Sequence, residues 1–171
     1  MTHENITAKV LALDLATTTG WADIAHGIID SGSRSFARKP ATKTRPASTP
    51  GEPFCLFDAW LNELIRTAKP DLIVYEEVYR WMSSSAAHAF CGFRAVLLKT
   101  CHYKGITVKG YSPTEIKKFF TGKGNAKKRH MIAEARKRWP ELNLTSDDEV
   151  DAIAILHLHL KNTTNQRATN L

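Results

Sequence analysis

Two short apolar runs, each followed by an acidic residue, constrain the fold of this chain more than any other feature. Asp14 ends the run Val10–Leu13, and Glu76 ends the run Leu72–Tyr75. Runs that are apolar at every position are typical of strands covered on both faces of a sheet. A carboxylate in such a setting is costly to bury unless it is paired or holds a cation. The runs therefore predict buried strands that carry acidic groups for a specific purpose.

A second acidic pattern opens the last apolar helix. Residues 146–149 (SDDE) have the form of a capping box. Asp148 and Asp151 stand three residues apart, so both carboxylates lie on one face of the helix. Acids in a first helical turn are common caps, and that interpretation is preferred for Asp147 and Glu149. Asp151 lies among apolar residues, which favours a functional role for Asp151 and for Asp148.

The remaining pattern predicts an α/β fold in which helices flank a mixed five-stranded sheet. Strands are expected at 8–15, 20–25 and 27–36, as an antiparallel meander, and at 71–76 and 105–111. Helices are expected at 54–68, 83–102, 112–121, 125–139 and 146–160. One domain is predicted over residues 1–171, with a frayed polar tail at 162–171.

A proline-rich basic segment at residues 37–53 interrupts this pattern. It holds four prolines among lysines and arginines and cannot contribute to a core, so a mobile basic loop is predicted. The whole chain has 24 Lys and Arg residues against 17 Asp and Glu, a net charge of +7. This excess favours a polyanion such as nucleic acid as the partner.

A second basic cluster precedes the acidic helix. Its residues, which are predicted to grip a phosphate backbone, are Lys117, Lys118, Lys123, Lys127 and Arg129. The alternative is a solvated helix face, which charge runs usually form.

The cysteines and the chain's apolar runs indicate the compartment. Cys55, Cys91 and Cys101 match no zinc-binding spacing. The first residues lack the pattern of a signal sequence, and no apolar run reaches the roughly 18 residues that a membrane span needs. A reducing cytoplasm without membrane association is predicted.

Converging carboxylates would repel one another unless a metal ion neutralised them. Mg²⁺ prefers oxygen ligands, and two ions roughly 4 Å apart can clamp a phosphodiester. The predicted ligands are Asp14, Glu76, Asp148 and Asp151, holding two Mg²⁺ ions for which Mn²⁺ could substitute. Lys128 is predicted either to stabilise charge on the phosphate or to position the water. Glu77 follows Glu76 on one strand, so the two side chains point to opposite faces and only one can join the site.

Four stretches in order carry a resemblance to a known family. They are LALDLATTTGWA at 11–22, VYEEVY at 74–79, GKGNAKK at 122–128 and SDDEVDAIAI at 146–155. Together they cover residues 8 to about 160, and they resemble the RuvC family of Holliday-junction resolvases within the RNase H-like nucleases. The resemblance implies an RNase H-like sheet. It also implies a crossover junction endodeoxyribonuclease that resolves four-way or other branched DNA by paired nicks and leaves 5′-phosphate ends.

The resemblance also assigns residues. The family's acidic ligands fall, in order, on Asp14, Glu76, Asp148 and Asp151. Its basic active-site residues fall on Lys117 and Lys128, and the aromatic residue similar to one that contacts junction bases falls on Tyr79. Arg80 and Trp81 are expected to join Tyr79 in stacking on unpaired bases. Packing in the core is the alternative for Tyr79 and Trp81.

Two features depart from the family pattern. Bacterial members usually carry Pro-Gly after the first aspartate, where this chain has Leu15-Ala16, and the loop at 37–53 is unlike theirs. The departures indicate a divergent, phage-type relative. Two symmetric nicks need two active sites, so a homodimer is expected. The resemblance places its surface on the helix 83–102, whose apolar stripe includes Phe90 and Phe93.

Two other classes of function were weighed. Residues 14–20 also look like the phosphate loop of actin-like and sugar-kinase ATPases, but 171 residues leave no room for a second lobe. A catalytically silent nucleic-acid-binding module on the same fold is the other alternative. The four intact acids argue against it, because a silent copy has no reason to keep them buried.

Overall fold

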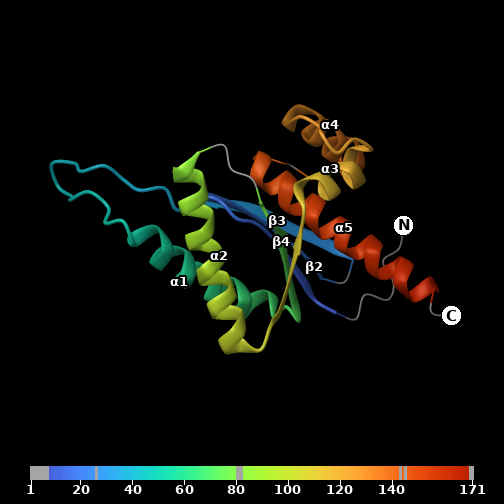
Figure 1. Ribbon diagram of the computed structural model, residues 1–171, viewed down its shortest axis with the longest axis horizontal. Helices are drawn as coiled ribbons and strands as arrows, with labels where there is room; N and C mark the ends of the chain where they lie inside the picture. Colours follow the sequence, from blue (N-terminus) through green and yellow to red (C-terminus); the bar gives the residue numbers. More distant parts are fainter. Residues whose placement is uncertain (1–7, 26, 80–82, 143, 145, 170–171) are drawn as a thin grey trace.

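The computed structural model describes residues 8–25, 27–79, 83–142, 144 and 146–169. Five strands form one sheet, and helices cover both of its faces (Figure 1). In chain order the elements are β1 (Val10–Asp14), β2 (Thr18–Ala25), β3 (Ile28–Ser35), α1 (Glu52–Ala68), β4 (Leu72–Glu76), α2 (Ser84–Lys104), β5 (Thr107–Tyr111), α3 (Pro113–Thr121), α4 (Lys128–Arg138) and α5 (Asp147–Thr169). No helix among these described residues is long and apolar enough to cross a membrane.

The sheet has the order β3-β2-β1-β4-β5. The first three strands pair antiparallel, whereas β4 pairs parallel with both β1 and β5. The predicted α/β fold with a mixed five-stranded sheet is therefore confirmed. The most apolar strand, β1, takes the centre, where both of its faces are covered.

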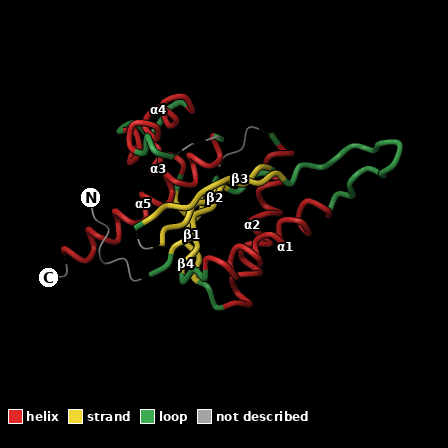
Figure 2. The backbone as a smooth tube through the Cα atoms, turned by 180° about the vertical axis from the view of Figure 1, so that it is seen from behind, coloured by secondary structure: helices red, strands yellow, loops and turns green. Residues whose placement is uncertain are grey.

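Figure 2 shows α1 and α2 on one side of the sheet and α5 on the other. Alternation along the central strands divides the core into two corresponding layers. Leu11 and Leu13 of β1 face one layer, which contains residues of α1 and α2. Val10 and Ala12 face the other, which contains residues of α3, α4 and α5. Since side chains alternate along a strand, Asp14 belongs to the second face. This alternation decides which acidic groups can meet.

Two predicted boundaries need correction. The last helix does not end near Leu160 but continues to Thr169, because no Gly or Pro interrupts it. Side chains also bond back within it, as the Thr164 hydroxyl donates to the carbonyl of Leu160 over 3.0 Å. The loop predicted at 37–53 ends at Gly51, since α1 begins at Glu52. Fraying of the tail and mobility of the loop stay predictions, and residues 170–171 lie outside the described part.

The apolar stripe of α2 does not form a free surface. Phe90 is 5% exposed and Phe93 is 1% exposed, and both belong to the core layer beneath α1 and α2. The ring of Phe93 lies 5.1 Å from that of Phe57 in α1. The protomer buries this stripe itself, so Phe90 and Phe93 are not available to a partner subunit. That the helix 83–102 is the dimer surface stays a prediction.

Candidate active site

Two acidic side chains end neighbouring parallel strands. The last recorded pair between β1 and β4 is Leu13 with Tyr75, and each strand has one further residue, Asp14 and Glu76. Both residues follow the face that α5 covers, because Ala12 and Val74 two positions earlier lie in that core layer. The sheet thus delivers two carboxylates to one edge.

The first turn of α5 adds the aspartates of the helix. Asp14 is paired with Gly20 of β2. A Cβ atom built on Gly20 would lie 1.8 Å from the carbonyl oxygen of Asp148. Only glycine therefore lets the start of α5 rest directly on the strand beside Asp14. The sequence interpretation missed this role, although a glycine inside a strand is a known signal of close backbone approach.

Hydrogen bonds fix the start of α5 on the sheet. The Glu149 N–H donates to the Ser146 hydroxyl over 3.1 Å, which is the N-terminal half of the predicted capping box. The Glu149 carboxylate is buried and accepts a hydrogen bond from the Ser31 hydroxyl of β3 over 2.8 Å. These contacts hold Asp148 and Asp151 in place relative to the strands.

The pKa values show that the four acidic groups share one electrostatic neighbourhood. Burial, and then the charges of Asp151, Glu76 and Asp148, raises the pKa of Asp14 well above its ordinary range. Burial, followed by the charge of Asp151, raises the pKa of Glu76 to about 7. Burial raises the pKa of Asp151 to about 6, against the lowering effect of Lys128 and Lys117. Groups that disfavour one another's charge in this way favour an added cation.

Two lysines reach this acidic cluster from α3 and α4. Lys128 is the first residue of α4, and its Nζ lies 2.9 Å from Oδ2 of Asp147. Burial works against its charge, but the bond to Asp147 and the charges of Asp148 and Asp151 raise its pKa. Lys117 of α3 is partly buried and lowers the pKa of nearby acids. Asp147, interpreted from sequence as a helix cap, thus also holds Lys128.

Glu77 is directed away from the cluster, toward Arg94 of α2. Its Oε1 lies 2.9 Å from Nε of Arg94 in α2, and its Oε2 accepts a hydrogen bond from the Tyr75 hydroxyl. Arg94 Nε also donates to the Tyr75 hydroxyl over 2.9 Å. The two adjacent glutamates therefore lie on opposite faces, as the alternation predicted, and Glu76 is the one beside Asp151.

The donor set of the cluster fits a hard divalent cation. All four acidic groups offer oxygen atoms, which Mg²⁺ and Mn²⁺ prefer. The raised pKa values of Asp14, Glu76 and Asp151 would fall once a cation neutralised these groups. Within the described part of the chain, no group of three or more His, Cys, Asp or Glu side chains is arranged so that it could hold a metal ion. The fit to a cation therefore rests on the chemistry of the donor atoms.

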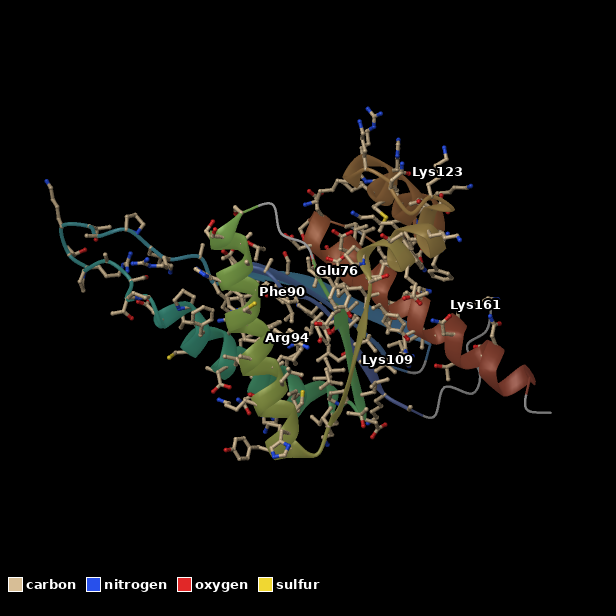
Figure 3. All side chains as sticks on the ribbon, in the orientation of Figure 1. Glu76, Phe90, Arg94, Lys109, Lys123 and Lys161 are labelled. Carbon is tan, nitrogen blue, oxygen red and sulfur yellow. The ribbon has the colours of Figure 1, made fainter. Side chains whose placement is uncertain are left out.

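The predicted DNA contacts differ in their exposure. Tyr79 is 75% exposed, so core packing is excluded for its ring. Arg80 and Trp81 lie outside the described residues. Four of the predicted backbone contacts in α3, α4 and the loop between them are exposed: Lys118, Lys123, Lys127 and Arg129. Figure 3 shows Lys123 on the outer side of this region, away from the sheet.

Comparison with known proteins identifies the family. The model of the family described as "Crossover junction endodeoxyribonuclease RuvC" matches residues 20–159. The chain belongs to the RuvC family. The RuvC of Syntrophomonas wolfei is 31% identical over 157 residues, which are 88% of this chain and 88% of that protein. The resemblance inferred from four motifs is confirmed, and the ATPase alternative is excluded.

Solved RuvC structures share the fold. Thermus thermophilus RuvC superposes with a TM-score of 0.69 at 17% identity, covering 92% of this chain and 96% of that one. The same RuvC in complex with a Holliday junction substrate gives a TM-score of 0.67 at 18% identity, covering 89% of this chain and 92% of that one. At such identities the likeness concerns the fold alone. Members of the RuvC family are metal-dependent nucleases.

The region matched by the RuvC model contains Glu76, Lys128, Asp148 and Asp151 but begins after Asp14. The position of Asp14 therefore rests on the strand pairing described above, which places it beside Glu76.

Proposed function

We propose that this RuvC-family chain is an endonuclease that resolves four-way DNA junctions by paired nicks and leaves 5′-phosphate ends. The observation that carries the proposal is the meeting of four acidic groups from β1, β4 and α5 beside two lysines. Family membership and the structural likeness to a RuvC solved with a Holliday junction substrate support it.

The proposed cofactor is Mg²⁺, two ions per site, with Mn²⁺ able to substitute. Asp14, Glu76, Asp148 and Asp151 would hold the ions. When bound, they would supply the positive charge that phosphodiester hydrolysis needs at the attacking and leaving oxygens.

The remaining roles belong to residues around the acids. Lys128 would hold a phosphate oxygen at the site, and Asp147 would orient its ammonium group, 2.9 Å away. Lys117 would add positive charge beside Glu76. Tyr79 is exposed next to the end of β4 and would stack on a base at the branch point, together with Arg80 and Trp81.

Adjacent glutamates give a matched test of the site. Glu76→Gln should abolish most cleavage of a labelled four-way junction in Mg²⁺ while junction binding in gels persists, because the change removes a ligand and not a phosphate contact. Glu77→Gln, one residue away, should still cut, because Glu77 faces Arg94 on the other side of the sheet. Asp14→Asn should behave like Glu76→Gln.

Removal of divalent ions by a chelator should stop the wild-type reaction, and added Mg²⁺ should restore it. Full cleavage by Glu76→Gln, or loss of cleavage only in Glu77→Gln, would reject this ligand set. A wild-type protein that shifts junctions in gels and never cuts them under any divalent ion would instead be a silent binding module.

Paired nicks require two active sites, so we also propose a homodimer, acting in the cytoplasm. Sedimentation of the free protein and of its junction complex tests the subunit number directly.

A further inference from the structure

An arm formed by residues 37–51 projects from the body of the protein in both views (Figures 1 and 2). Buried residues fix its two ends. Phe36 packs against Phe57, with ring centroids 5.4 Å apart, and Pro53 is buried in the first turn of α1. The Phe36 N–H also donates to the carbonyl of Thr17 over 2.6 Å. The base of the arm therefore belongs to the core, and only the residues between its ends leave it.

Hydrogen bonds join the two limbs of the arm. The Ser48 N–H donates to the carbonyl of Lys39 over 2.9 Å, and the Lys39 N–H donates to the Ser48 hydroxyl over 3.0 Å. Nearer the tip, the Thr42 N–H donates to the carbonyl of Arg45 over 2.8 Å, and the Arg45 guanidinium donates to that of Pro40 over 2.7 Å. A chain held in this way loses less conformational entropy when it binds a partner.

The arm starts at the sheet edge that carries the acidic cluster. Asp14 is paired with Gly20 of β2, and Thr18 of the same strand is paired with Ser35, the last residue of β3. The chain leaves the sheet directly after Ser35. The arm therefore leaves the sheet at the same end of the strands as the acidic cluster, although Phe36 at its base packs in the layer of α1 and α2.

The charge of the arm has a single sign. Residues 37–51 contain no Asp or Glu and four basic residues, Arg38, Lys39, Lys43 and Arg45. None of the ion pairs recorded within the described ranges involves the arm. A second copy of the chain would bring the same arm and the same net charge of +7. Charge complementarity therefore favours a polyanion over another subunit.

We propose that the arm binds the sugar–phosphate backbone of a duplex branch of the DNA substrate, away from the bond that is cut. The proposal rests on the function proposed above, but the contact itself needs only duplex DNA. One limb of about seven residues reaches at most roughly 25 Å, over which a DNA strand presents roughly seven phosphates. Lysine ammonium groups would act as point charges on phosphates and would not read base sequence.

The test removes two charges from the arm without touching its internal bonds. Lys39→Gln with Lys43→Gln neutralises two exposed side chains, whereas Arg38 and Arg45 donate to carbonyls inside the arm and are left intact. The matched control, Lys104→Gln with Lys161→Gln, removes the same charge from exposed positions on α2 and α5. Figure 3 shows Lys161 on α5, at the other end of the molecule from the arm. Thermal melting confirms that both variants are folded.

Binding of the full chain to a linear duplex and to a four-way junction is measured over a range of salt concentrations, without divalent ions. Each phosphate contact contributes about 0.9 to the slope of log K against log salt. The arm variant should lose roughly two from that slope and about tenfold in affinity at low salt, whereas the control variant should keep the wild-type slope. On junctions whose branches are too short to reach the arm, wild type and arm variant should bind equally.

Equal slopes for wild type and arm variant would overturn the proposal. So would equal losses in the arm and control variants, since the effect would then come from net charge. A smaller oligomer with an unchanged slope would mean that the arm holds another subunit. A wild-type protein whose duplex binding depends on the arm but which cuts no branched DNA would leave the arm's role standing and reject the proposed function.

Discussion

Burial sets the protonation of the acidic residues before any metal ion binds. Glu76 has its pKa raised from 4.5 to about 7, and Asp151 has its pKa raised to about 6, in both cases chiefly by burial. Between pH 4.5 and about 7 the folded metal-free protein therefore binds more protons than the unfolded chain. Its free energy of unfolding falls as pH rises through that window.

Replacing Glu76 should therefore stabilise the metal-free protein at high pH. Glu76→Gln is expected to raise the free energy of unfolding by roughly 1–3 kcal/mol at about pH 8, because the cost of charging a buried carboxyl is removed. The gain should vanish near pH 4, where the carboxyl is protonated in both states. Denaturant unfolding in a chelator measures both values.

Glu77→Gln is the control, and it should destabilise the protein at about pH 8 because Arg94 loses its charged partner. If Glu76→Gln is less stable than wild type at high pH, burial does not disfavour the charged form of Glu76.

Protons and metal ions should compete for the same carboxylates. Since the pKa of Glu76 is about 7, cleavage at a limiting Mg²⁺ concentration should rise as pH increases from about 6 to about 8. Raising the Mg²⁺ concentration should move the midpoint of the rise to lower pH. A midpoint that does not respond to metal concentration would assign the titration to a group outside the ligand set.

At the level of elements, the contact between β2 and α5 sets the geometry of the site. Gly20→Ala would place a Cβ atom 1.8 Å from the carbonyl oxygen of Asp148, so the first turn of α5 must move. That movement carries Asp148 and Asp151 away from Asp14. We expect cleavage to fall at least a hundredfold, because a misplacement of about 1 Å can cost that much. Single-turnover cleavage measures the loss.

Gly51→Ala is the matched control, since a Cβ atom there meets nothing within 4 Å and the φ angle of −85° suits any residue. It should cut like wild type. Wild-type activity in Gly20→Ala would mean that the start of α5 does not need to rest on β2.

Sequence patterns predicted the elements well where a local signal exists. The alternation and apolar runs located all five strands. The predicted start of α3 is also observed, because the Ser112 hydroxyl accepts a hydrogen bond from the Glu115 N–H over 3.2 Å. The end of α5 was missed because a polar segment without Gly or Pro is compatible both with a continued helix and with an irregular tail. Local pattern cannot tell these two outcomes apart.

The site shows the same division. The acids could be picked out because each interrupts an apolar pattern, which is a local anomaly. The roles of Gly20 and of the bond between Glu149 and Ser31 could not be predicted, since they depend on how α5 crosses the sheet. Likewise the periodicity of α2 placed Phe90 on an apolar stripe without saying whether the same protomer or a partner subunit covers it.

Over the whole molecule, the segments proposed to contact DNA are grouped at one end of the sheet. The acidic cluster, the start of α3 and the base of the arm lie at the same end of the sheet, where Glu76 pairs with Tyr111 and Thr18 pairs with Ser35. The layer of α1 and α2 lies on the opposite face of the sheet from α5. A second subunit could therefore dock on the outer side of α2 without covering the cluster.

The proposed homodimer makes a prediction that separates association from folding. If the outer face of α2 is the contact, Ala95→Glu, which adds a charge at an exposed position in the middle of that helix, should repel its copy across a twofold axis. Such a variant should sediment as a monomer, keep the wild-type melting temperature and nick only one strand of a junction per encounter.

Phe90→Ala should instead lower the stability of the protomer. Its buried ring supports the protomer, so the free energy of unfolding should drop by about 3 kcal/mol or more. An Ala95→Glu protein that stays dimeric and cuts in pairs would place the subunit contact on another face.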